Sequence, residues 1–253
     1  MSIVNSEYIK QFISNNQYIF VNAKGEEEIG YTRVPYSWTH GATEKHIGDG
    51  MLVYSIIQLM RYKTLVCLGS GGGFIPRIMT QARIDLHEQG IFEGNPDYNH
   101  GDIGVTYLVD ACNGVGGVVN YTEDSNFFTN VFHPRFIKDT TENAYYNFFV
   151  KQDIKIDFLH IDAGHSYEDV KQDFELYTNI LSENAIVSIH DTDERYQEEF
   201  IVTEDEKEYF QTWDGPSRFI KDISSEWKQF NFFNTGQVRN KPSSTGITLL
   251  QRA

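Results

Sequence analysis

The sequence predicts an α/β fold with a largely parallel sheet and helices on both faces. Three largely apolar runs, 65–68, 154–161 and 185–189, are short enough to be strands, and the last is apolar apart from Ser188, as is typical of buried parallel strands. Apolar residues at helical spacing fill 167–181, between the second and third runs, and predict a helix that starts at Ser166 and that Asn184 can end. The same reasoning predicts further helices over 49–60, 74–87 and 216–227. Strand, helix and strand in immediate succession are typical of a doubly wound, Rossmann-like sheet.

Glycines directly after the first strand predict a loop that binds a nucleotide-type cofactor, because glycine lets the backbone turn sharply against a ligand. The dinucleotide pattern G-x-G-x-x-G requires a glycine where the chain has Phe74, so NAD and an oxidoreductase are disfavoured. The spacing G-x-G-x-G is instead similar to the first motif of class I S-adenosylmethionine (SAM) dependent methyltransferases. An ordinary glycine-rich turn is the alternative. The loop residues expected to contact SAM are Gly69, Ser70, Gly71 and Gly73.

Carboxylates also follow the next two predicted strands. The strand 105–110 ends in Asp110, where folds of this kind place a carboxylate that accepts hydrogen bonds from both ribose hydroxyls. A shorter strand, 135–138, precedes Asp139, which could reach an adenine amino group or simply cap the helix that follows. The segment 89–104 is rich in Gly, Asn, Asp and Pro and is too long for a usual helix-to-strand loop, so we expect an insertion there.

Length and charge favour one domain that acts on a small molecule. The 253 residues are 40% hydrophobic, enough for one well-cored domain. A formal net charge of −15 repels phosphate backbones and anionic lipid heads, which argues against nucleic acid or a membrane surface as the main partner. No apolar run approaches the roughly 18 residues of a spanning helix, and Cys67 and Cys112 fit reduced core thiols. We expect a cytoplasmic protein, either monomeric or a homo-oligomer.

The first 50 residues are expected to form a helix and a loop-like cap in front of the main domain, 51–253. Apolar side chains at helical spacing predict an amphipathic helix over 5–20. The segment 30–50 either contributes to the ligand pocket or covers the surface, and the acidic run 193–208 predicts a solvated surface segment or a lid. The aromatic and polar residues of the cap segment are Tyr31, Arg33, Tyr36, Trp38, His40, Glu44, His46 and Asp49.

Four polar side chains follow the later strands at the same predicted edge of the sheet. One strand ends in Asp162, with His165 three residues further on, and the next ends in His190 and Asp191. Neighbouring parallel strands bring their carboxyl ends together, at the edge where open α/β sheets bind ligands. These four side chains are therefore expected to lie beside the glycine loop.

The run 157–170, together with the pair 190–191, resembles the small-molecule O-methyltransferases that include macrolide sugar O-methyltransferases and the cephalosporin-pathway methyltransferase. The resemblance implies the seven-stranded methyltransferase sheet, a general base at His165 and a Mg²⁺ site made by Asp162, His190 and Asp191, with Asp162 also beside the cofactor. His190 stands where the family has a carboxylate. Because Mg²⁺ prefers oxygen and imidazole suits Mn²⁺, Fe²⁺ or Zn²⁺ better, the identity and the need of a divalent cation stay open.

The resemblance implies a SAM-dependent O-methyltransferase of a small polar acceptor, such as a sugar, a surface-glycan precursor or a related metabolite. If the acceptor oxygen is already anionic, as in a phosphoramidate, His165 would orient it and no base would be needed. Two other functions stay open: a metal-dependent oxygenase with Asp162, His165 and His190 as ligands, and a non-catalytic SAM-binding protein. Two structural alternatives also stay open, namely that His165 caps the following helix and that His190 is a hydrogen-bonded core histidine.

Overall fold

The computed structural model describes residues 17–21, 27–31, 40, 42–43, 46–69, 74–88, 104–111, 135–194, 199–204, 207–212, 214–233 and 245–253. The loop residues Ser70, Gly71 and Gly73, almost all of the expected insertion 89–104, and Cys112 lie outside the described residues.

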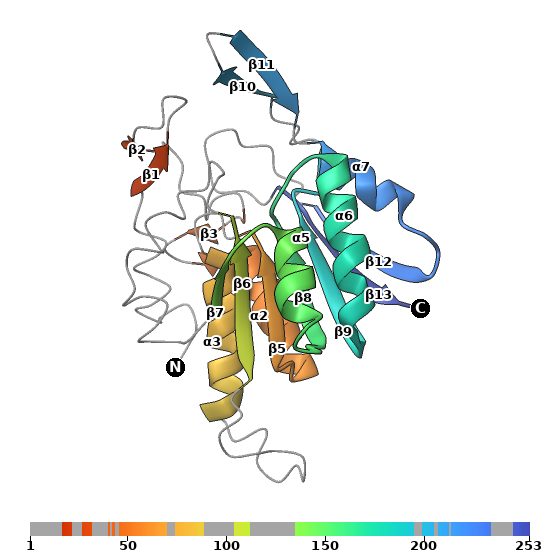
Figure 1. Ribbon diagram of the computed structural model, residues 1–253. Helices are drawn as coiled ribbons and strands as arrows, with labels where there is room; N and C mark the ends of the chain where they lie inside the picture. Colours follow the sequence, from red (N-terminus) through yellow and green to blue (C-terminus); the bar gives the residue numbers. More distant parts are fainter. Residues whose placement is uncertain are drawn as a thin grey trace.

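A seven-stranded mixed sheet forms the centre of the molecule, in the order β12-β13-β9-β8-β5-β6-β7 (Figure 1). Strands β5, β6, β7, β8 and β9 are parallel to one another. Strand β13 is antiparallel to β9, and β12 is antiparallel to β13. This sheet confirms the predicted fold class. Its strands are β5 (Thr64–Leu68), β6 (Val105–Asp110), β7 (Arg135–Lys138), β8 (Ile156–Ile161), β9 (Leu181–His190), β12 (Trp227–Phe232) and β13 (Ile247–Arg252).

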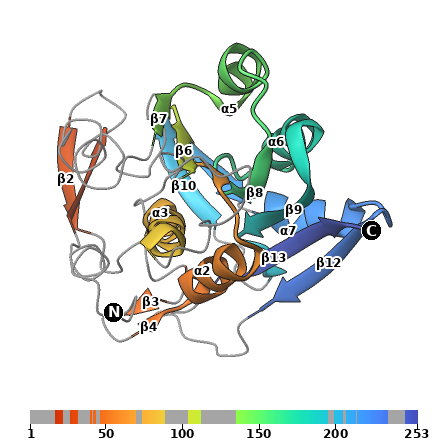
Figure 2. The same ribbon diagram turned by 90° about the horizontal axis from the view of Figure 1, so that it is seen from below.

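Helices cover both faces of this sheet (Figure 2). On one face, α2 (Asp49–Met60) and α3 (Phe74–Glu88) pack against Leu65 and Cys67 of β5. On the other face, Val66 and Leu68 of the same strand lie in a second core with residues of α5, α6 and α7. Alternate side chains of β5 therefore enter two separate cores, because successive residues of a strand point to opposite faces. The helices of the second face are α5 (Thr141–Ala144), which continues as the π-helical turn η4 (Tyr145–Phe149), α6 (Tyr167–Tyr177) and α7 (Gly215–Asp222).

Helix α6 begins where the sequence predicts but ends earlier. Ser166 is its N-cap, because the Ser166 hydroxyl accepts a hydrogen bond of 3.1 Å from the backbone N–H of Asp169. After Tyr177 the chain forms the 3₁₀ turn η5 (Thr178–Ile180), and β9 starts at once. The expectation that the helix ends at Asn184 is wrong, since pairing of β9 with β8 already starts at Leu181 and takes Asn184 into the strand.

The helix predicted over 216–227 is also too long at its C-terminal end. The observed α7 ends at Asp222, and Trp227 instead begins β12. The Trp227 ring is buried against Phe174 of α6, with ring centroids 5.0 Å apart, so tertiary packing draws this residue into the sheet.

Three short hairpins lie outside the main sheet. They are β1 (Gln17–Val21) with β2 (Glu27–Tyr31), β3 (Ala42–Thr43) with β4 (His46–Ile47), and β10 (Glu199–Glu204) with β11 (Lys207–Thr212). The first hairpin corrects the predicted helix over 5–20: its last four residues belong to β1, where an aromatic and β-branched run suits a strand. Half of the acidic segment 193–208 falls in the strands of the third hairpin, which Figure 1 shows away from the main sheet. No described helix is long and apolar enough to span a bilayer.

Candidate active site

The carboxyl ends of β5, β6, β8 and β9 meet at one edge of the sheet, and the predicted site residues lie there. Backbone hydrogen bonds continue the sheet just past the strands: the N–H of Gly69 bonds to the carbonyl of Val109 (2.9 Å), and the N–H of Asp162 bonds to that of Leu68 (2.9 Å). Gly69 has a φ of +78°, and a Cβ there would lie 2.0 Å from the carbonyl oxygen of Asp162. The first glycine of the loop is therefore required by the close approach of β5 to the turn after β8.

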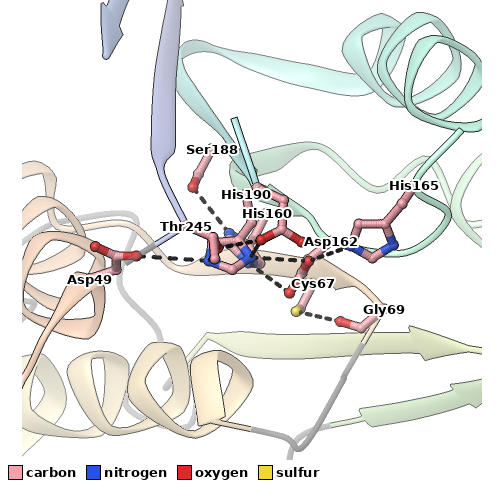
Figure 3. A network of polar contacts seen from close by, with 10 residues as sticks. Asp49, Cys67, Gly69, His160, Asp162, His165, Ser188, His190 and Thr245 are labelled. Atoms are coloured by element: carbon pink, nitrogen blue, oxygen red, sulfur yellow. Dashed lines mark hydrogen bonds and ion pairs between the residues drawn. The ribbon is translucent and has the colours of Figure 1, made fainter. Parts of the chain in front are cut away.

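Asp162 lies at the centre of a cluster of charged and polar side chains (Figure 3). The Nε2 atom of His165 is 2.8 Å from Asp191 Oδ2 and 3.6 Å from Asp162 Oδ1. The Nδ1 atom of His190 is 3.3 Å from Asp162 Oδ1 and 3.2 Å from Asp191 Oδ1. The structure thus brings together all four side chains that the sequence predicts at this edge.

Strand β13 and its preceding residues hold the Asp191 side of the cluster. Asp191 has a φ of +56°, a left-handed backbone conformation that is uncommon for aspartate. The Thr245 hydroxyl donates a hydrogen bond to Asp191 Oδ1 and lies 3.3 Å from His190 Nε2. The backbone N–H of Asp193 also bonds to the Thr245 carbonyl, at 3.0 Å. Residues over fifty positions apart in the sequence therefore fix the orientation of the 190–191 pair.

A sequence profile for a family of methyltransferase domains matches residues 66–192, just over half of the chain. The chain belongs to this family. The matched residues include β5, β6, β8 and β9, as well as the four clustered side chains.

Solved structures support the same fold. The methyltransferase TomG from Streptomyces achromogenes, an O-methyltransferase involved in tomaymycin synthesis and solved with SAM, has a TM-score of 0.51 at 13% identity, over 82% of this chain and 81% of that chain. An O-methyltransferase from Bacillus cereus in complex with SAH has a TM-score of 0.54 at 10% identity, over 81% of this chain and 80% of that chain. A curated relative, the uncharacterized protein y4gI of Sinorhizobium fredii, is 46% identical over 44 residues, which span 17% of this chain and only 5% of that protein.

In this methyltransferase domain, burial and opposite charge shift the pKa values of the four clustered side chains in opposite directions. Burial lowers the pKa of His165, but its hydrogen bonds to Asp162 and Asp191 outweigh burial and raise that pKa to about 10. Burial likewise lowers the pKa of His190, and the charges of Asp191 and Asp162 raise it above the usual range. Burial raises the pKa values of Asp162 and Asp191. The charge of His190 and the hydrogen bond from His165 outweigh burial and hold both pKa values well below the usual range. For these four side chains, opposite charge and hydrogen bonding therefore outweigh burial.

Two further histidines in the cluster were not predicted as site residues. His160 is fully buried, and burial lowers its pKa to about 4. Its Nδ1 atom is 3.1 Å from Ser188 Oγ, and its Nε2 atom is 3.9 Å from Asp162 Oδ2. The ring of His40 lies 4.0 Å from that of His190, and burial followed by the charge of His190 lowers the pKa of His40. The available signal for His160 was a histidine within the apolar run 158–161. His40 was visible only as one of several polar residues in the cap segment.

The expected cofactor side of the domain is described in part. Asp110 ends β6 at the same edge as Gly69, and its carbonyl accepts a hydrogen bond of 3.2 Å from the N–H of Asp139. The Asp139 Oδ1 atom accepts hydrogen bonds from the N–H of Thr140 (2.9 Å) and the side-chain amide of Asn143 (3.0 Å). Asp139 therefore supports the start of α5, where Thr140 is the N-cap. Its contact with adenine and the ribose contacts of Asp110 stay predictions.

Proposed function

We propose that this chain is a SAM-dependent O-methyltransferase of a small polar acceptor, such as a sugar, a surface-glycan precursor or a related metabolite. One observation carries the proposal: Asp162, His165 and Asp191 converge next to Gly69, within a domain of the methyltransferase family. The net charge of −15 supports a small-molecule partner over nucleic acid or membrane. Cytoplasmic location and a homo-oligomeric state stay predictions.

The residues at the carboxyl edge of the sheet fit SAM. The turn at Gly69 has no room for a Cβ, Asp110 presents a partly exposed carboxylate at the next strand end, and structures of this fold have been solved with SAM and SAH. In the proposal the glycine loop, Asp110, Asp139 and Asp162 hold the cofactor. When bound, SAM supplies a methyl group on a sulfonium, which is already a good leaving group. The protein therefore has to align the acceptor oxygen and make it nucleophilic.

His165 is the proposed base for that oxygen. Its Nε2 is the atom that faces both carboxylates, so Asp162 and Asp191 orient the ring and stabilise the imidazolium that forms when it takes a proton. General-base assistance of this kind is worth about 10² to 10⁴ in rate. Because the same carboxylates raise the pKa of His165 to about 10, positive charge placed on them would make His165 a more available base at neutral pH.

The cluster also fits a divalent cation. His190 Nδ1 is buried, has no hydrogen bond to any described residue, and lies within 3.3 Å of an oxygen from Asp162 and one from Asp191. Asp162, His190 and Asp191 would hold the ion. When bound, it would polarise the acceptor hydroxyl and so ease the loss of its proton.

A second kind of acceptor is supported by the pKa of His165. A histidine with a pKa of about 10 is cationic at neutral pH and would bind an acceptor that is already anionic, such as a phosphoramidate or a carboxylate. His165 would then orient the acceptor through a charge-assisted hydrogen bond and would remove no proton.

Two substitutions separate cofactor binding from chemistry. Asp110→Ala should weaken SAH binding by a factor of about ten or more in calorimetry, since hydrogen bonds to a charged group contribute about 1.5 to 3 kcal/mol each. His165→Ala should keep the affinity for SAH. It should lower the rate of methyl transfer, followed as the SAH formed in the presence of an acceptor, by about 10² or more. His87→Ala, near the end of α3, is the matched control and should change neither quantity. Full activity of His165→Ala would exclude the base and favour the anionic acceptor, while unchanged SAH binding by Asp110→Ala would remove Asp110 from the cofactor site.

A further inference from the structure

Buried histidine nitrogens without hydrogen bonds are concentrated around Asp162. In the described part of the chain, four buried side-chain polar atoms have no hydrogen-bond partner, and three of them are His40 Nδ1, His160 Nε2 and His190 Nδ1. A buried polar atom that is left without a hydrogen-bond partner destabilises the fold. Their concentration at one point indicates a site that binds something electrophilic, since an imidazole nitrogen without a proton is a strong ligand for a metal ion.

The tautomer of His190 follows from its neighbours. The single proton of the Thr245 hydroxyl is donated to Asp191, so the 3.3 Å contact between Thr245 Oγ1 and His190 Nε2 must be a hydrogen bond donated by the ring. Asp49 Oδ2, 3.8 Å from the same Nε2, also favours the proton there. Binding of a metal ion requires the neutral ring, and in that form the lone pair is on Nδ1, which faces carboxylate oxygens of Asp162 and Asp191. Such a contact becomes attractive when a cation lies between the atoms.

His40 adds a second imidazole to this point. Its ring lies between Phe74, with centroids 5.6 Å apart, and His190, with centroids 4.0 Å apart, and only 7% of the residue is exposed. Its backbone carbonyl accepts a hydrogen bond of 2.8 Å from the N–H of Asp49, which ties the residue to the start of α2. Ligand atoms of His40, Asp162 and His190 all lie within 4.8 Å of one another.

We propose that His40 is a further ligand of the cation that the proposed function places at Asp162 and His190, and that the ion is a first-row transition metal such as Mn²⁺, Fe²⁺, Co²⁺ or Zn²⁺. The inference rests on that cation site of the proposed function and not on the identity of the acceptor. Two imidazoles and one carboxylate suit these ions, whereas Mg²⁺ selects oxygen ligands in an octahedron. Asp162 also belongs to a second group of possible ligands, with His165 and Asp191. His40 lies outside the residues that match the methyltransferase family, so this ligand is a feature of the cap segment of this chain.

Metal binding by these three residues can be measured in the absence of SAM and acceptor, so its test does not depend on methyl transfer. The full-length protein, freed of metal by a chelator, is titrated with Co²⁺, Zn²⁺ and Mg²⁺ by calorimetry, and Co²⁺ binding is followed by its visible absorption. We expect one Co²⁺ or Zn²⁺ per chain, bound at least about tenfold more tightly than Mg²⁺. His40→Ala should weaken Co²⁺ binding by at least about tenfold and change the visible bands, with little effect on Mg²⁺.

Two further variants keep the test decisive. His40→Gln preserves much of the side-chain volume and should show the same loss if His40→Ala folds poorly, whereas His87→Ala controls for adventitious histidine binding and should leave the Co²⁺ titration unchanged. Wild-type Co²⁺ affinity and absorption in both His40 variants, preference for Mg²⁺ over Co²⁺, or binding of neither ion would each overturn the proposal. Methyl transfer that persists in any of these cases would leave the proposed function standing.

Discussion

Gly69 occupies the tightest backbone contact of the candidate site. Its φ of +78° is strained for any other residue, and a Cβ would meet the carbonyl oxygen, the carbonyl carbon and the next Cα of the turn at Asp162, all within 2.6 Å. Gly69→Ala must therefore push the glycine loop away from Asp162. We expect a loss of about 2 kcal/mol or more in the free energy of unfolding, measured with urea, together with weaker SAH binding in calorimetry.

Gly50 gives the matched control for this substitution. It lies in helix α2, where the three atoms nearest to a Cβ would be side-chain atoms of Ile78 and Phe74 at 3.1 to 3.3 Å, and these side chains need to shift by only a few tenths of an ångström. Alanine is also the better helix former, so Gly50→Ala should be close to neutral in stability and in SAH binding. Equal effects of the two substitutions would contradict the assignment of Gly69 to the cofactor turn.

Single residues differ in how far the sequence reveals them. Asp162 and the 190–191 pair could be predicted because each directly follows an apolar run, and a parallel sheet brings such strand ends together. His160 lies inside β8 and does not end the strand, so it was not expected at the edge of the sheet. His40 lies in an irregular segment, where no periodicity indicates the direction of a side chain. Their contacts with Asp162 and His190 depend on packing between distant segments, which local sequence does not encode.

Helix α6 links element geometry to the site, because its N-cap directly follows the proposed base. Ser166 Oγ accepts the N–H of Asp169, and loss of such a cap costs about 1 kcal/mol. Ser166→Ala should lower stability by that amount and also lower kcat, since His165 loses its fixed position beside the helix. Ser166→Asp should restore most of both quantities, because aspartate is an equally good N-cap.

A second capped helix provides the comparison. Thr140 caps α5 through a 3.2 Å hydrogen bond from the N–H of Asn143, and α5 carries none of the clustered side chains. Thr140→Ala should therefore cost a similar free energy of unfolding and leave kcat unchanged. If Ser166→Ala also left kcat unchanged, the cap would act on stability alone.

Several boundaries of the elements could be predicted, whereas β8 begins two residues later and β9 four residues earlier than predicted. The two wrong helix ends have one kind of cause. Strands β5, β6 and β7 and helices α2 and α3 lie within a residue of their predicted limits, since apolar periodicity and glycine breaks coincide there. The C-terminal ends of α6 and α7 were placed too late. In both cases a tertiary contact decides the limit: the pairing of β9 with β8 in the first and the burial of Trp227 in the second.

At the scale of the whole molecule, the order of strands was accessible only through resemblance. Alternating strands and helices predict a parallel sheet, but they do not say that β8 lies beside β5 or that β13 is inserted between β9 and β12. The antiparallel end of the sheet matters for the site, because residues leading into β13 hold Asp191 and His190 through Thr245. The closing strands therefore complete the site as well as the sheet.

The stability of the whole fold should depend on the protonation of Asp173, a buried residue of α6. Burial raises the pKa of Asp173 to about 7, and the negative charge of Asp169 adds to this, while a hydrogen bond with Thr141 acts in the opposite direction. The carboxyl group has a pKa of about 3.9 in the unfolded chain, so folding takes up a proton between these values. The stabilisation that protonated Asp173 gives the folded state is therefore fully present below about pH 4, declines as the pH rises towards 7, and is lost above pH 7.

Asp173→Asn keeps the shape of the protonated side chain and removes its titration. The variant should match the wild type in urea unfolding at pH 4 and exceed it at pH 8, by up to about 4 kcal/mol, because three pKa units correspond to roughly that energy. Glu175→Gln, an exposed carboxylate two residues further along α6, removes the same charge and should give a pH-independent difference within about 0.5 kcal/mol. A stability difference between Asp173→Asn and wild type that is the same at both pH values would mean that Asp173 is ionised in the folded protein, and the carboxylate would then need a compensating charge.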